Sequence, residues 1–267
     1  MSRLILCSDD FAYSPAISAA IVALAHAGKI NAVSCMAVMP GWAEDARMLA
    51  DLPAHVEIGL HLTLTEEAPR TAMPRFAPDG RMPRVDPLAA AASRWTVPLD
   101  EVATEISAQF DAFFAALRRP PAFVDGHQHV HVLPGIRDLV LAETAARAPG
   151  AWVRDCTDGA AAMLARPFTG KAIGSAWHSR GLRAAAAALG LRTNDGFAGH
   201  YNFRGDYAAL FPRFLRRPGP MHLVMCHPGA GERTGDGIAA ARIVEAKALH
   251  RLPIADMAVA EGLAFPA

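Results

Sequence analysis

Residues 3–62, RLILCSDDFAYSPAISAAIVALAHAGKINAVSCMAVMPGWAEDARMLADLPAHVEIGLHL, decide the fold of this chain. Their apolar pattern predicts a strand at 3–7, a helix at 15–27, a strand at 32–38, a helix at 42–51 and a strand at 56–62. The first helix has Ser14 in position to cap its start, Pro15 as its first residue and Gly28 after its end. Strands and helices that alternate at this spacing are typical of βαβ units, so we predict a parallel sheet.

The rest of the chain repeats this pattern after one irregular segment. Residues 63–98 are rich in proline and contain the turn Asp79-Gly80, which indicates an irregular insertion. We expect this insertion to be a lid or binding loop, and a decorative insertion is the alternative. Further strands are predicted at 122–124, 152–154 and 221–226, with a strand end and loop at 196–200. Further helices are predicted at 99–117, 134–147, 158–166, 176–189, 207–215, 238–250 and 254–261. The pattern predicts an α/β fold in a single domain, residues 1–267, with a mostly parallel sheet of about seven strands.

The composition argues against several classes of partner. Lys and Arg together number 26, as do Asp and Glu, so the chain has no basic surplus that would attract nucleic acid or anionic lipid. The cysteines are scattered in or beside apolar runs, which predicts buried thiols in a reducing compartment, at Cys7, Cys35, Cys156 and Cys226. The first residues lack the apolar run of a signal peptide, and no stretch approaches the roughly 20 apolar residues of a membrane span. We therefore expect a cytoplasmic protein.

Chemically reactive side chains follow the predicted strands. In chain order they are Asp9, Asp10, His61, Asp125, His127, Arg154 and His227. Because the carboxyl ends of parallel strands gather on one face, these residues can meet there. Asp10, His61 and His127 would supply one carboxylate and two imidazoles, which suit a divalent ion such as Zn²⁺, Mn²⁺, Fe²⁺ or Co²⁺.

The remaining reactive groups would then carry proton transfer. Asp9 would be free to act as the base and His227 as the general acid. Asp9 and Asp10 could instead be a charge motif near a helix start, since acidic residues are common and stabilising there.

The stretch Asp125-Gly126-His127-Gln128-His129-Val130-His131 contains three histidines within five residues. If the strand continued through it, Asp125, His127, His129 and His131 would all project to one face. Such a convergence would indicate a metal or proton-transfer site. Any single histidine could also be an ordinary core or surface residue that is satisfied by hydrogen bonds.

Four motifs together give the chain a family resemblance: Ser8-Asp9-Asp10-Phe11, GLHLTLT at 59–65, DGHQHVH at 125–131 and Cys226-His227-Pro228-Gly229. In this order and spacing they resemble the YdjC-like carbohydrate deacetylases, which include chito-oligosaccharide and hopanoid-associated deacetylases. The resemblance implies a distorted (β/α) barrel that holds one divalent metal ion, with Mg²⁺ or Zn²⁺ favoured and Mn²⁺, Fe²⁺ or Co²⁺ as alternatives. It also implies an enzyme that removes N-acetyl groups from amino sugars.

The resemblance also implies roles for individual residues. It places the metal ligands on Asp10, His61 and His127 and the base on Asp9. The acid would be His227, and an orienting or substrate-binding role would fall to Arg154, Asp125, His129 and His131. The chain departs from the family at Ala12, where glycine is common after the Asp-Asp-Phe motif; alanine tolerates positive φ less well than glycine.

The expected partner is an N-acetylated sugar, held by the 63–98 segment and by aromatic side chains such as Trp95 and Trp177. One alternative is another barrel metallohydrolase or isomerase, because one fold hosts many reactions. A phosphoesterase would need more cationic residues than Arg154 alone. A non-catalytic sugar-binding protein with a structural metal would have no use for a base and an acid beside the ion. A homodimer through the alanine-rich helices is also possible.

Overall fold

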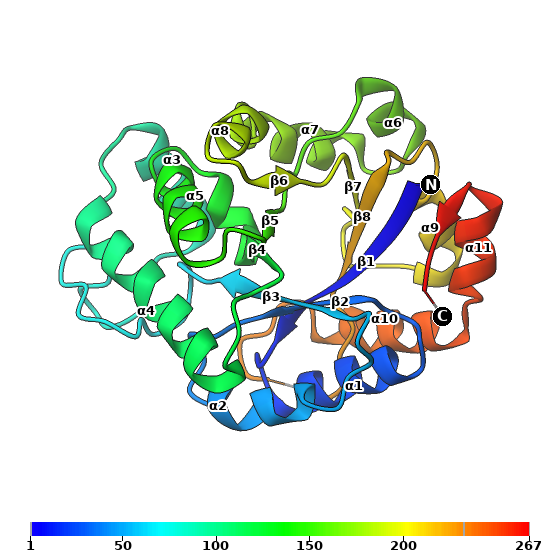
Figure 1. Ribbon diagram of the computed structural model, residues 1–267, viewed down its shortest axis with the longest axis horizontal. Coiled ribbons are helices and arrows are strands. Elements are labelled where there is room, and N and C mark those ends of the chain that lie inside the picture. Colours follow the sequence, from blue (N-terminus) through cyan, green and yellow to red (C-terminus); the bar gives the residue numbers. More distant parts are fainter. Residues whose placement is uncertain (1, 232, 267) are drawn as a thin grey trace.

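The computed structural model describes residues 2–231 and 233–266, and it shows a curled parallel sheet surrounded by helices (Figure 1). In this part of the chain the sheet has nine strands, in the order β6-β5-β4-β3-β2-β1-β8-β7, with β9 beside β1. Their bounds are β1 Ser2–Phe11, β2 Ala32–Cys35, β3 Glu57–Leu62, β4 Phe123–Gly126, β5 Trp152–Val153, β6 Arg192–Thr193, β7 Gly196–Ala198, β8 Met221–Cys226 and β9 Leu263–Ala264. Each neighbouring pair runs parallel. The prediction of a distorted, mostly parallel barrel is confirmed, and the two strands it lacked, β6 and β9, have two residues each.

Helices cover the outside of the sheet. Their bounds are α1 Pro15–His26, α2 Trp42–Asp45, α3 Val85–Ser93, α4 Leu99–Leu117, α5 Ile136–Arg147, α6 Ala160–Ala165, α7 Thr169–His178, α8 Leu182–Ala188, α9 Tyr207–Phe214, α10 Ala239–Arg251 and α11 Ile254–Ala260, with 3-10 turns η1 at Ala46–Leu49 and η2 at His127–Val132. Ser14 caps α1, because its side chain accepts a hydrogen bond from the Ile17 backbone N–H. In the described residues no helix combines the length and apolar character needed to cross a membrane.

Three segments differ from the prediction. The 63–98 insertion is not wholly irregular, because it contains α3. The helix predicted at 176–189 is two helices, since Gly181 between α7 and α8 has a φ of 82°, which breaks the helical path. The helix predicted at 42–51 is one turn of α-helix followed by the 3-10 turn η1.

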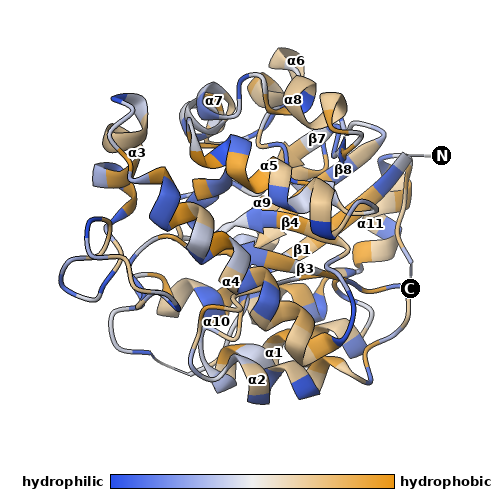
Figure 2. Cartoon of the chain, turned by 60° about the vertical axis from the view of Figure 1, so that its left-hand side comes forward, coloured by the Kyte–Doolittle hydropathy of each residue, from blue (hydrophilic) through white to orange (hydrophobic). Residues whose placement is uncertain are grey.

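The two faces of β1 pack against different sets of residues. Leu4 and Leu6 belong to the larger apolar cluster, which includes the helix residues of α1. Ile5 and Cys7 belong to a second cluster inside the curl of the sheet, where the rings of Phe123 and Trp152 stack at 4.5 Å. Figure 2 shows β1, β3 and β4 between α1 and α5. By alternation Asp9 lies on the inner face, so the reactive end of β1 opens into the curl.

Candidate functional site

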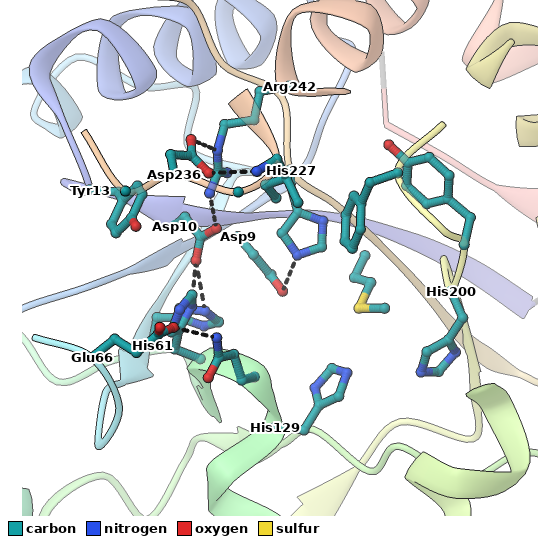
Figure 3. Close-up of a pocket in the computed structure, with 18 of the residues that line it drawn as sticks. Asp9, Asp10, Tyr13, His61, Glu66, His129, His200, His227, Asp236 and Arg242 are labelled. Atoms are coloured by element: carbon teal, nitrogen blue, oxygen red, sulfur yellow. Dashed lines mark hydrogen bonds and ion pairs between the residues drawn. The ribbon is translucent and has the colours of Figure 1, made fainter. Parts of the chain in front are cut away.

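A cavity of about 400 Å³ opens where the strands end, and predicted reactive residues from four strands line it (Figure 3). Its lining includes Asp9 and Asp10 from β1, His61 from β3, His127 after β4 and His227 after β8. The rule that carboxyl ends of parallel strands share one face therefore brings together side chains that are up to 218 residues apart, as 227 − 9 = 218.

A bulge near the end of β1 turns both of its carboxylates into this cavity. Successive residues of a regular strand point to opposite faces, so only one of Asp9 and Asp10 would face inward. The pairing of β1 with β2 shifts register between Ser8 and Phe11, and Asp10 has a φ of 67°. Aspartate tolerates this left-handed conformation better than most residues. Ala12 also has a positive φ, 73°, so alanine adopts the conformation for which glycine is better suited.

Asp10, His61 and His127 converge with the geometry of a metal site. Asp10 Oδ1 lies 3.2 Å from His61 Nε2 and 2.9 Å from His127 Nδ1. One donor atom from each residue lies within 4.8 Å of the others. These spacings fit three ligands that each bond one ion at about 2.0–2.2 Å. Asp10 and His61 are buried, whereas the His127 side chain is 15% exposed, so the set is open toward the cavity.

The groups behind these three residues fix their orientation. Asp125 Oδ1 lies 2.7 Å from His61 Nδ1, so Nε2 is the atom that points to Asp10. Burial opposes a charge on His61, but the Asp125 and Asp10 carboxylates outweigh it and raise its pKa to about 10. Arg242 donates to Asp10 Oδ2 at 2.7 Å. Burial would raise the pKa of Asp10, but Arg242 and His127 hold it well below its usual value.

A buried arginine holds Asp9. Arg154 donates to both oxygens of the Asp9 carboxylate, at 2.7 and 2.6 Å, and also pairs with Asp125. Burial opposes ionisation of Asp9, but Arg154 outweighs it and lowers the pKa of Asp9 below its usual range. Arg154 is fully buried and is not part of the cavity lining. It can therefore orient Asp9 but cannot touch a molecule in the cavity.

His227 is the second group close to the Asp9 carboxylate. Its Nε2 lies 3.9 Å from Asp9 Oδ2, and its side chain is 14% exposed. Burial lowers the pKa of His227 to about 4, against the opposing effect of Asp10 and Asp9. His227 is therefore neutral near pH 7 when the cavity holds no substrate. Its backbone N–H donates to Glu245 Oε2 at 2.5 Å.

The strand does not continue through the 125–131 stretch, so the condition for one common face of Asp125, His127, His129 and His131 is not met. β4 ends at Gly126, and Gln128 and His129 have left-handed φ values of 52° and 60°. This turn places His129 in the cavity wall, whereas His131 lies under the floor with its Nε2 2.9 Å from the Arg154 carbonyl oxygen. A sharp turn replaces the strand alternation on which the expectation depended.

The expected aromatic contacts are also wrong. Trp95 and Trp177 are 70% and 65% exposed and do not line the cavity. The lining residues that sequence reasoning missed are Tyr13, Glu66, Gln128, Lys171, His200, Tyr201, Phe203, Met225, Asp236 and Arg242, with the loop residues 235, 237 and 238. His200 follows the end of β7, so the strand-end rule could have found it. From the 63–98 insertion, the cavity receives Glu66.

Comparison with known proteins agrees with this architecture. A model of the YdjC-like protein family matches residues 3–257. The chain is 33% identical to a chitooligosaccharide deacetylase of Enterobacter sp. (strain 638) over 144 residues, which cover 54% of this chain and 56% of the relative. It is 34% identical to a chitooligosaccharide deacetylase of Yersinia pestis (strain Pestoides F) over 140 residues, 52% of this chain and 54% of the relative. The chain thus spans about half the length of the curated relatives it matches.

A solved structure extends the likeness of fold to the whole chain. A provisionally named cellobiose-phosphate cleavage protein from Enterococcus faecalis V583 superposes with a TM-score of 0.74 at 20% identity, over 99% of this chain and 97% of that one. This likeness concerns the fold alone. Because the family model matches residues 3–257, nearly the whole chain, the chain belongs to the YdjC-like protein family.

Proposed function

We propose that the protein is a metal-dependent hydrolase that removes an N-acetyl group from an amino sugar or oligosaccharide. The observation that supports this best is the placement of Asp10, His61 and His127 on one cavity floor with Asp9 and His227 beside them. The names of the two chitooligosaccharide deacetylases support the same substrate class. A binding protein with a structural metal would gain nothing from a carboxylate and an imidazole that flank the ligand set.

Asp10, His61 and His127 would hold one divalent ion, with Mg²⁺ or Zn²⁺ as first candidates. When bound, such an ion polarises a carbonyl group and lowers the pKa of water. Asp125 keeps His61 Nε2 directed at the site, and Arg242 occupies the second oxygen of Asp10, which leaves Oδ1 for the ion.

Asp9 and His227 would move the protons of amide hydrolysis. Asp9 is ionised across the neutral range because Arg154 lowers its pKa, so it can accept a proton from the attacking water. The amine of the sugar must leave with a proton, and His227 would donate it. His227 is neutral at rest, so it must gain a proton before it can donate one. Once Asp9 has taken a proton from the attacking water, Asp9 Oδ2 at 3.9 Å from His227 Nε2 is a nearby source of that proton, and the negative charge that develops on the attacked carbonyl favours its uptake.

The charges around the cavity favour a neutral acetamido sugar over a phosphate ester. The lining carries four carboxylates, on Asp9, Asp10, Glu66 and Asp236. Its two basic side chains that stay charged are Lys171 and Arg242, and Arg242 is already paired with Asp10 and Asp236. The lining also contains the aromatic residues Tyr13, Tyr201 and Phe203.

Acetate release from N-acetylated sugars tests this proposal. The metal-loaded protein should release acetate from at least one member of a panel of N-acetylated mono- and oligosaccharides. His227→Ala should keep the metal and lose roughly 10²- to 10⁴-fold in turnover, as expected for the loss of a general acid. No acetate from any sugar would contradict the function, and unchanged turnover in His227→Ala would contradict the role of His227.

A further inference from the structure

Helix α10 turns two charged side chains toward the site. Its buried residues are Ala241, Arg242, Glu245, Ala248 and Leu249. This spacing is the inward stripe of an ordinary surface helix, in which apolar residues are expected at every position. Arg242 is accounted for by its ion pairs with Asp10 and Asp236. Glu245, one turn further along the helix, is fully buried and does not line the cavity.

Glu245 joins two parts of the cavity wall that are 26 residues apart in sequence, as 227 − 201 = 26. Its Oε2 accepts a hydrogen bond from the His227 backbone N–H at 2.5 Å, and its Oε1 accepts one from the Tyr201 hydroxyl. Tyr201 packs on Phe203 at 4.8 Å between ring centroids, and Phe203 meets the His227 imidazole edge-on at 5.4 Å. One carboxylate therefore fixes both the backbone of His227 and the aromatic wall beside its ring.

The buried position of Glu245 is costly for a charged side chain. Burial disfavours the charged form and raises the pKa of Glu245 to about 7, although its bonds to Tyr201 and His227 and the charge of Arg242 act in the opposite direction. An apolar residue of similar size would avoid this cost, but it would leave the buried His227 N–H and the Tyr201 hydroxyl without an acceptor. Buried groups that carry such a cost are concentrated at functional sites.

We propose that Glu245 is a positioning residue, which holds His227 and Tyr201 in place relative to Asp9. This proposal rests on the proposed function, since it treats His227 as the proton donor to the leaving amine. Glu245 acts only through its two hydrogen bonds and does not touch the substrate. The distance that it controls is that between His227 Nε2 and Asp9 Oδ2, which is 3.9 Å.

Two variants of Glu245 separate positioning from simple support of the fold. Glu245→Leu leaves the His227 N–H and the Tyr201 hydroxyl without their acceptor, whereas Glu245→Gln keeps one oxygen for the His227 N–H. Each metal-loaded variant is assayed on an N-acetylated sugar that the wild type cleaves and on nitrophenyl acetate, whose phenolate leaves without a proton. We expect Glu245→Leu to lose about 100-fold in kcat on the sugar and less than about threefold on the aryl ester, with Glu245→Gln within about tenfold of the wild type on both.

A matched pair of tyrosines tests the second hydrogen bond. Tyr201→Phe removes the hydroxyl that Glu245 accepts, and Tyr207→Phe removes a neighbouring buried hydroxyl that has no hydrogen-bond partner in the described residues. Tyr201→Phe should lower kcat/KM on the sugar by about three- to tenfold, and Tyr207→Phe by less than about twofold. Equal effects of the two variants would contradict the bond to Tyr201.

The remaining outcomes are distinct. Equal losses on the sugar and the aryl ester in Glu245→Leu would show that Glu245 only supports the fold and would overturn the proposal. Crystal structures of Glu245→Leu and Glu245→Gln give a readout that needs no activity: His227 should move away from Asp9 in the first and keep its place in the second. A wild type that releases no acetate from sugars would refute the proposed function, whereas an unmoved His227 in Glu245→Leu would refute the positioning role.

Discussion

Replacement of Asp125 by asparagine should weaken metal binding although Asp125 is not among the proposed ligands. Asp125 is fully buried and its Oδ1 accepts hydrogen bonds from the Ser34 hydroxyl at 2.5 Å and from His61 Nδ1 at 2.7 Å. Its Oδ2 pairs with Arg154. In Asp125→Asn the amide oxygen can still accept from His61, but the amide NH₂ then faces the Arg154 guanidinium, so two donors meet. The imidazole loses both a charged partner and a fixed orientation.

The expected loss follows from the role of such partners. Removal of a carboxylate that orients a ligating imidazole costs about 10- to 100-fold in metal affinity, or about 1.4–2.7 kcal/mol. The fold should persist, because Arg154 keeps its two bonds to Asp9. Asp9→Asn is the matched control, since Asp9 pairs with the same arginine, whereas Asp125 is the carboxylate that bonds His61 Nδ1.

Calorimetric titration with Zn²⁺ of the metal-free wild type, Asp125→Asn and Asp9→Asn measures the affinities directly. Asp125→Asn should show the 10- to 100-fold higher Kd, and Asp9→Asn should keep its affinity within about threefold while losing most of its turnover. Thermal unfolding of the three metal-free proteins checks that each is folded. The reasoning would be refuted by a Kd of Asp125→Asn equal to that of the wild type, or by an equal loss in both variants.

Three further predictions concern other parts of the molecule. His127→Ala removes one of three proposed ligands, so metal content and activity should disappear together, and full metal occupancy by elemental analysis would contradict the ligand set. The pKa of Glu245, raised to about 7, exceeds that of an unfolded glutamate, so the Glu245 contribution to the free energy of unfolding is lost as the pH rises from about 4.5 to 7. Buried histidines such as His227, whose pKa is lowered to about 4, act in the opposite direction, so the test is a difference between two proteins. Urea denaturation should show that the free energy of unfolding of the wild type falls by about 2–3 kcal/mol relative to Glu245→Gln between pH 5 and pH 8, and identical pH dependence of the two would contradict the assignment. Gly59→Ala would place a Cβ 2.4 Å from the Phe123 ring, so it should lower the free energy of unfolding by about 1–3 kcal/mol, and an unchanged denaturation midpoint would count against this packing.

Much of the fold could be predicted from local patterns. The helix over 99–117 has the predicted bounds, and so has the strand over 221–226, because apolar periodicity over many residues is the strongest local signal. The buried state of Cys7 and the other cysteines also agrees with their apolar neighbours. The broken helix at Gly181 and the two-residue strands β6 and β9 carried too little local signal to be predicted.

The candidate site, like the fold, was predictable from the sequence only in part. The sequence by itself determined that Asp10, His61, His127 and His227 meet, because each lies at the carboxyl end of a strand of a parallel sheet or directly after it, and all such ends share one face. The tertiary structure alone decided how they meet. The bulge at Asp10 turns two successive carboxylates inward, against the alternation of a regular strand.

The turn after β4 likewise places His129 in the cavity wall with His127 and His131 outside the cavity. Arg154 under Asp9 and Glu245 under His227 come from distant elements, and neither lies in the cavity itself. Bulges, left-handed turns and buried ion pairs depend on the residues that pack around them. The short-range periodicity of apolar residues in the sequence does not identify those neighbours. The sequence therefore determined which residues gather at the sheet edge, and only long-range packing decided the direction in which each side chain points.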